Sequence, residues 1–148
     1  MKTGDACKRN AVVVKRHTSI PAAAKLMRHN HVGSLVVVDD LDDRVPVGIV
    51  TDRDIVVEIV ASDLDPRTMT VGEIMGGELV TAGDEDDSFD TLRLMRLKGV
   101  RRVPVVTDKG LLVGIATFDD LLGVLASEFG TLVRVVETGQ SREELARR

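Results

Sequence analysis

The chain has 148 residues, of which 43% are hydrophobic, and its 20 basic and 24 acidic side chains give a formal net charge of −4. This composition is ordinary for a soluble folded domain and gives no electrostatic reason to expect a nucleic-acid partner. With no apolar run near the ~18 residues of a membrane span, no signal-peptide core and a single cysteine (Cys7), we expect no membrane partner, no internal disulfide and a cytoplasmic location.

The first half of the sequence predicts the element order β-α-β-β-α. Residues 11–14 are a short β-branched strand, and a helix follows over residues 19–27, with a serine cap and a proline in its first turn. Two further β-branched runs, residues 35–38 and 45–50, are joined by an acidic loop and predict a strand pair. Apolar residues at helical spacing then continue a helix from Asp52.

The second half predicts the same order of elements. Residues 79–81 and 87–97 predict a strand and a helix. Residues 103–106 and 111–117 flank an Asp-Lys-Gly turn, which is typical of a hairpin. Residues 118–128 predict the closing helix.

The two halves are copies of one another. A shift of 68 positions places Gly4 on Gly72 and Met27 on Met95, and the shift falls to 66 after a longer loop in the first half. A length change confined to a polar loop is what a hairpin tolerates. Because each half alone would have a marginal core, we expect the halves to pack as one unit. We therefore predict repeats at 3–61 and 71–130, a linker at 62–70 and a C-terminal helical extension at 131–148.

Each repeat carries the same polar phrase after a short apolar strand. Residues 47–54 read VGIVTDRD and residues 113–120 read VGIATFDD, so that a threonine ends the strand and an aspartate follows three positions later. Such a pair resembles a capping box, in which the two side chains satisfy free amides at a helix start. A hydroxyl and a carboxylate at a helix start are also suited to holding a phosphate and a ribose. On the residues alone, both interpretations stay open.

Two such phrases in register with a full-length repeat resemble a tandem pair of cystathionine-β-synthase (CBS) domains, the arrangement called a Bateman module. The resemblance covers about residues 3–130 and also rests on Met27, Met95 and the run GVRRVPVV at 99–106. It implies a mixed α/β (α+β) fold of two β-α-β-β-α repeats about a pseudo-twofold axis, with clefts that bind adenosine derivatives. It also implies a homodimer with a regulatory role, sensing energy or metabolite status for an enzyme or transporter.

The resemblance assigns roles to the paired polar residues. Asp54 and Asp120 would accept hydrogen bonds from the two ribose hydroxyls, because a carboxylate offers lone pairs for both. Thr51 and Thr117 would donate to the 5′-phosphate, helped by free amides at the helix start. Without a Cβ, the paired glycines would let the backbone approach the ligand. These are Gly48 and Gly114, and an adenine slot would draw on Ile49, Val50, Ile115 and Ala116.

The two expected sites are not identical. Arg102 stands where related modules often place a phosphate contact, whereas its counterpart Ser34 cannot neutralise a phosphate. The alternative for Arg102 is a solvated basic edge that pairs with the acidic residues 84–87. In the second phrase Phe118 replaces Asp52. We therefore expect the two sites to differ in preference.

Several other site classes find little support. With no Trp or Tyr and three Phe, the chain lacks the stacking platforms of single-strand nucleic-acid binders. The three histidines with Cys7 have no second pair at zinc-ligand spacing, so we expect no metal. We also find no set of nucleophile, base and orienting residue, so we expect no enzyme.

We therefore predict a stand-alone regulatory module. It would need no cofactor and would bind AMP, ADP, ATP, NAD or S-adenosylmethionine as regulatory ligand, acting on a separate effector protein. The alternative is a scaffold or oligomerisation protein in which the Thr-x-x-Asp motifs only cap helices. Beyond the second repeat, apolar residues continue the helical pattern to Val133, and residues 141–144 resemble another capped helix start. This extension would either form a dimer contact or fold back on its own module.

Overall fold

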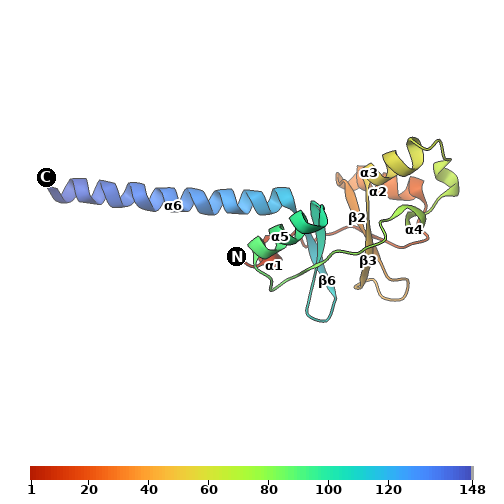
Figure 1. Cartoon of the computed structure of the whole chain (residues 1–148), viewed down its shortest axis with the longest axis horizontal. Coiled ribbons are helices and arrows are strands. Elements are labelled where there is room, and N and C mark those ends of the chain that lie inside the picture. The colour runs from red at the N-terminus through yellow and green to blue at the C-terminus, as the bar shows by residue number, and fades with distance from the viewer. Residues whose placement is uncertain (148) are drawn as a thin grey trace.

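The fold is mixed α/β, as predicted, with two three-stranded sheets and a long helix that projects from them (Figure 1). The computed structural model describes residues 1–147. Each sheet carries helices from its own half of the chain, and the two sheets stand side by side in Figure 1.

The first half forms a sheet with strand order β1-β2-β3. Strand β1 (Val13–Val14) pairs in parallel with β2 (Ser34–Val38), and β2 pairs in antiparallel with β3 (Pro46–Thr51). Helix α2 (Ile20–Asn30) begins where the Ser19 hydroxyl accepts the amide of Ala22. After β3 the chain enters α3 (Asp52–Ile55) and continues as the π-helix η1 (Val56–Val60).

The second half repeats this topology. Its sheet has the order β4-β5-β6, with β4 (Ala82–Gly83) parallel to β5 (Arg102–Val106) and β5 antiparallel to β6 (Leu112–Thr117). Between β4 and β5 runs α5 (Ser88–Lys98). Gly110 takes a left-handed φ of 77° in the predicted hairpin turn. Helix α6 (Phe118–Arg147) follows β6 directly.

Some predicted boundaries are wrong. The first strand of each half is only two residues long. In the second half this strand, β4, begins after the expected 79–81 run, and Val80 of that run packs against the second core instead. The expected new helix at residues 141–144 is also absent, because α6 continues through this region to Arg147. Gly139 does not interrupt the helix, and the segment contains no proline that would remove a backbone donor.

Two short helices that the sequence analysis did not identify connect the halves. Helix α1 (Thr3–Ala6) packs against β4, β6, α5 and α6 of the second half, where the amide of Gly4 donates to the carbonyl of Asp84. Helix α4 (Val71–Ile74), after the 3₁₀ turn η2 (Pro66–Thr68), packs on the first half. Each half is thus completed by the segment that precedes the other half in the sequence.

Each sheet has one face in its own core. Leu35 and Val37 lie in the first core with Val71 and Ile74 of α4, whereas Val103 and Val105 lie in the second. The alternate residues Val36 and Val38 are equally buried but belong to neither core, so this face of β2 is covered by the rest of the body. Direct hydrogen bonds also join the halves, from the Leu112 amide to the Arg44 carbonyl and from Arg102 to the Gly33 carbonyl.

Candidate functional site

The strand register confirms that the two motifs occupy equivalent places. Ser34 at the start of β2 lies opposite Thr51 at the end of β3, and Arg102 at the start of β5 lies opposite Thr117 at the end of β6. Each motif threonine is therefore the last residue of a strand, and each motif aspartate lies in the first turn of the helix that follows. We call the surroundings of Thr51 and Asp54 the first-half site, and those of Thr117 and Asp120 the second-half site.

In the first-half site the two motif side chains bind each other's backbone. The Thr51 hydroxyl accepts the Asp54 amide at 3.1 Å, and the Asp54 carboxylate accepts the Thr51 amide at 2.8 Å. This is a complete capping box. The capping interpretation of the motif is therefore realised in this half.

In the second-half site only one of these two bonds forms. The Thr117 hydroxyl accepts the Asp120 amide at 3.1 Å, but the Asp120 carboxylate does not return the bond. Its Oδ2 atom is buried and has no hydrogen-bond partner among residues 1–147, while its Oδ1 atom lies 3.7 Å from the Lys8 ammonium. A buried carboxylate oxygen without a donor is costly, and this one leaves an open acceptor at the start of α6.

The space beside each motif glycine is occupied by other atoms of the protein. A Cβ on Gly48 would lie 2.8 Å from the Met75 sulfur, and one on Gly114 would collide with the backbone carbonyl of Lys8. The expectation that these glycines admit ligand is therefore incomplete, because the segment from the opposite half already fills the space. Gly114 is required for the close approach of two backbones.

The apolar residues proposed for an adenine slot divide between two faces. Val50 and Ala116 are fully buried in the two cores and cannot line a ligand site. Ile49 and Ile115 point to the other face of their strands and are half-buried. Of the four, Ile49 and Ile115 thus keep some exposed surface, and Ile115 also bridges the backbone of Lys8.

Arg102 reaches across to the first half. Its Nη1 donates to the Gly33 carbonyl at 3.0 Å, and a Cβ on Gly33 would meet both this guanidinium and the Asp52 carboxylate. The alternative pairing of this basic edge with residues 84–87 is wrong. Arg101 pairs instead with Asp119 at 3.2 Å and lies 4.9 Å above the Phe118 ring.

Lys8 contacts the candidate second-half site, and the sequence analysis missed it. The repeat alignment contained a signal, since the shift of 68 positions places Lys8 on Gly76 and so marks a cation with no counterpart in the other half. Nothing in the sequence shows that the segment preceding one repeat packs on the other. Its neighbour Cys7 is partly buried against the second core, and this burial raises the pKa of the thiol.

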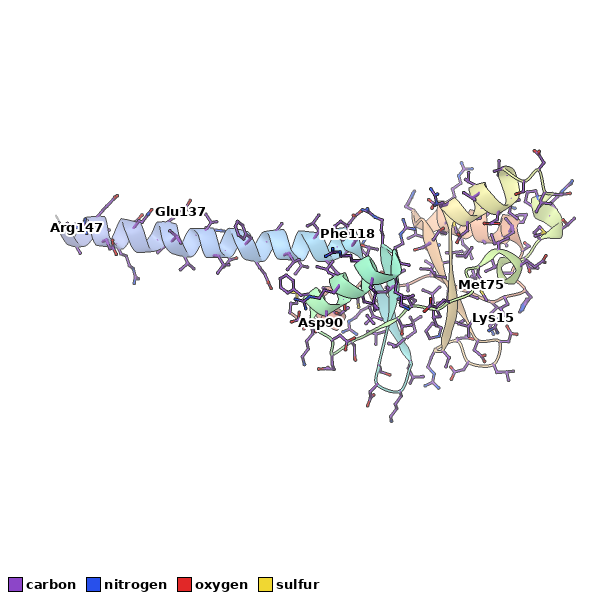
Figure 2. The ribbon with its side chains drawn as sticks, viewed as in Figure 1. Lys15, Met75, Asp90, Phe118, Glu137 and Arg147 are labelled. Carbon is purple, nitrogen blue, oxygen red and sulfur yellow. The ribbon has the colours of Figure 1, made fainter. Side chains whose placement is uncertain are left out.

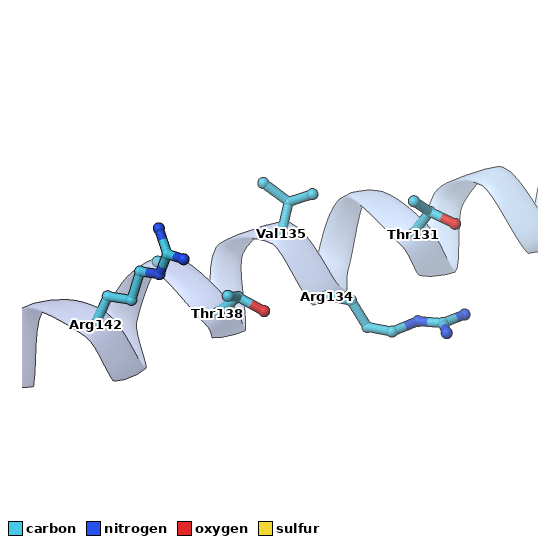
Figure 3. Close-up of a pocket in the computed structure, with 6 residues that line it drawn as sticks. Thr131, Arg134, Val135, Thr138 and Arg142 are labelled. Atoms are coloured by element: carbon cyan, nitrogen blue, oxygen red, sulfur yellow. The ribbon is translucent and has the colours of Figure 1, made fainter. Parts of the chain in front are cut away.

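Two hollows on the surface of residues 1–147 have no motif aspartate in their lining. One lies along the side of α6, where all of its lining residues come from a single helix (Figure 3). The other lies between α5 and the start of α6 and is lined by Leu92, Val100 and Phe118 beside Arg96 and Arg101. A hollow on one helix offers no enclosure for a small molecule.

Residues 1–147 were also compared with what a metal site and a membrane-spanning helix require. Within this range no three or more His, Cys, Asp or Glu side chains gather closely enough to hold a metal ion. None of the helices described there has both the length and the apolar character required to cross a membrane.

Comparison with known proteins shows which family and which individual proteins the chain is similar to. The CBS domain family model matches residues 4–61 and 71–127. A protein of Methanopyrus kandleri is 32% identical over 124 residues, which cover 84% of this chain and 62% of that protein. The chain thus spans less than two thirds of that relative's length.

Two solved structures of similar proteins contain adenosine compounds. A CBS domain protein from Pyrobaculum aerophilum in complex with AMP has a TM-score of 0.76 and 28% identity, covering 86% of this chain and 99% of that one. The CBS domain pair of protein MJ0100, in complex with 5′-methylthioadenosine and S-adenosyl-L-methionine, has a TM-score of 0.76 and 26% identity, covering 86% and 98%.

Proposed function

Because the chain belongs to the CBS domain family and carries two copies of the domain, we propose that it is a regulatory module that binds an adenosine-containing ligand at the second-half site. The candidate ligands are AMP, ADP, ATP, NAD and S-adenosylmethionine. Their common part is an adenosine, so the ribose hydroxyls are the groups that Asp120 would recognise. The two similar structures with adenosine compounds support this ligand class.

The observation that carries the proposal is the unpartnered oxygen of Asp120. A ribose hydroxyl donating to Oδ2 would satisfy a buried acceptor that the protein leaves open. Thr117 at the same helix start would then face the 5′ substituent, and Ile115 the base. Asp54 differs, because its Oδ2 accepts the Thr51 amide and none of its oxygens is both buried and unpartnered among residues 1–147.

The alternative function, a scaffold without ligand, has one specific observation in its favour. The complete capping box at Thr51 and Asp54 explains the first motif without any ligand. It does not explain the second motif, in which the box is open. We therefore propose unequal sites, with ligand bound in the second half and capping dominant in the first.

A panel of ligands tests this proposal on the wild-type chain. Thermal unfolding is followed with AMP, ADP, ATP, NAD and S-adenosylmethionine, and calorimetry gives the dissociation constant of any compound that shifts the transition. A ligand at 100 times its dissociation constant adds about 2.7 kcal/mol to the free energy of unfolding. If no adenosine compound shifts the transition or gives binding heat, the scaffold function replaces the regulatory one.

A homodimer is also part of the proposal, and α6 is its candidate contact. Phe129, Leu132, Val133 and Val136 follow the i, i+3, i+4, i+7 spacing of one helix face and are all exposed. Figure 2 shows Glu137 and Arg147 on the part of α6 that projects beyond the body. A lone helical segment with Gly130, Gly139 and several β-branched residues is marginal in water.

A second copy of the chain would cover this apolar face. The same face on two helices is self-complementary, as a twofold interface requires. The contrary expectation, that the extension folds back on its own module, is wrong in this structure, because the helix extends away from the body (Figure 1). A regulatory rather than catalytic role, a cytoplasmic location and a separate effector protein complete the proposal.

A further inference from the structure

Lys8 is held at the second-half site by its backbone. Its amide donates to the Ile115 carbonyl and its carbonyl accepts the Ile115 amide, each at 2.9 Å. This bridge fixes the Cα of Lys8 beside β6, and the absence of a Cβ on Gly114 permits the close approach. The ammonium group then extends to within 3.7 Å of Asp120 Oδ1.

The pairing of Lys8 with Asp120 is exchangeable. The Lys8 side chain is 66% exposed. An ion pair in which one side chain is this exposed contributes little to the free energy of folding. Arg101 pairs with Asp119 and the Arg9 guanidinium donates to the Gly4 carbonyl, so of these three cations Lys8 is the one beside the motif carboxylate. An anion that arrives at the start of α6 would therefore meet Lys8.

We propose that Lys8 determines the ligand class of the second-half site, favouring adenosine compounds with a negatively charged 5′ substituent over neutral or cationic ones. The inference rests on the proposed function and specifies its ligand. With the ribose hydroxyls on Asp120, the carboxylate exchanges its contact with Lys8 for two neutral donors. The freed ammonium, on its flexible stem, then pairs with a 5′-phosphate near Thr117.

The repeat gives the first half no residue equivalent to Lys8. The repeat alignment places Gly76 at the position of Lys8, and the neighbouring Met75 contributes a thioether beside Gly48. Arg102 reaches the first-half site from the other half, but its guanidinium donates to the Gly33 carbonyl. Selection by Lys8 therefore concerns the second-half site.

The test compares two ligands on four proteins by calorimetry. AMP carries a 5′-phosphate and 5′-methylthioadenosine carries a neutral group on the same nucleoside. The proteins are wild type, Lys8→Met, Lys8→Arg and Lys2→Met. The last variant is the matched control, because it removes the same charge from the same N-terminal segment but from a side chain paired with Glu85. Thermal unfolding of each variant confirms that it is folded.

We expect Lys8→Met to weaken AMP roughly five- to tenfold, the strength of a charge-assisted hydrogen bond reduced by exposure, and to change 5′-methylthioadenosine less than about twofold. Lys8→Arg should retain AMP binding, and Lys2→Met should match wild type for both compounds. If Lys8→Met leaves AMP unchanged, or weakens both compounds equally, Lys8 does not select charge, although the adenosine site stands. If wild type binds neither compound nor any other member of the panel, the proposed function itself fails.

Discussion

The hydroxyl oxygens of Thr3 and Thr91 lie 2.6 Å apart, although 88 positions separate the two residues in the sequence. Both residues are buried, Thr3 in α1 and Thr91 in α5, so the contact joins the start of the chain to the core of the second half. The second-half site depends on this contact indirectly, because the same N-terminal segment brings Lys8 to Asp120.

Replacement of Thr3 by valine should therefore destabilise the protein. The variant keeps the shape but leaves the Thr91 hydroxyl buried without its partner, at a cost of about 1–3 kcal/mol in the free energy of unfolding. The double variant Thr3→Val/Thr91→Val should recover part of this loss, since neither polar group then remains unpaired.

Denaturant unfolding measures both effects, and Thr131→Val on the exposed side of α6 is the matched control. The control should change stability by less than about 0.5 kcal/mol. Equal stability of Thr3→Val and the control would show that α1 does not dock on the second half in solution.

The two motif glycines should differ in their response to alanine. In Gly114→Ala the new Cβ meets the Lys8 backbone, which can move only if the Lys8–Ile115 bridge opens, so we expect a loss of about 1–3 kcal/mol or more. In Gly48→Ala it meets the end of the flexible Met75 side chain, which can rotate away, so the expected loss is below about 1 kcal/mol. Thermal unfolding of the pair ranks them, and the reverse order would contradict the described packing of Lys8.

Charge placed on the apolar face of α6 should separate the proposed dimer. We expect Leu132→Glu/Val136→Glu to shift the protein from dimer to monomer, because two like charges would face the same surface of the second copy. Thr131→Glu/Thr138→Glu adds the same charge on the opposite face, which lines the hollow in Figure 3, and should stay dimeric.

Sedimentation velocity or light scattering reports the mass of both variants. A wild-type chain that is monomeric at all concentrations would remove the dimer from the proposal. Dissociation of both double variants would place the contact on a different face of α6.

The repeat made most of the fold predictable. The shift between Met27 and Met95 and between the two Thr-x-x-Asp motifs was enough to place two equivalent sheets, and the observed register of Ser34 with Thr51 and Arg102 with Thr117 agrees with it. Regular apolar spacing also identified α5 within one residue of its ends, and α2 within one residue of its start and three of its end. The repeat and the helix spacing depend on local sequence, so a single sequence was enough to predict them.

The packing of α1 and α4 could not be predicted in the same way. The alignment of Gly4 with Gly72 shows that the two segments are equivalent, but equivalent segments can pack on their own half or on the other. That choice depends on side-chain fit across the whole body. The roles of Gly114 and Lys8 follow from it, so the sequence analysis attributed to a ligand the space that the Lys8 backbone occupies.

The difference between Asp54 and Asp120 was only partly visible in the sequence. The replacement of Asp52 by Phe118 predicted unequal sites, but an aspartate that completes a capping box and one that does not look the same in a motif. The difference is one of side-chain orientation, which the surrounding contacts determine. It is also the basis of the proposed function.

The central claim is tested most directly by AMP titration of wild type, Asp120→Asn and Asp54→Asn in a calorimeter. Asparagine keeps the size of aspartate but replaces one acceptor oxygen with a donor group, so Asp120→Asn should weaken AMP at least about tenfold, while Asp54→Asn should bind AMP as wild type does. Wild-type affinity in Asp120→Asn, or loss of binding in Asp54→Asn alone, would contradict the assignment of the ligand to the second-half site.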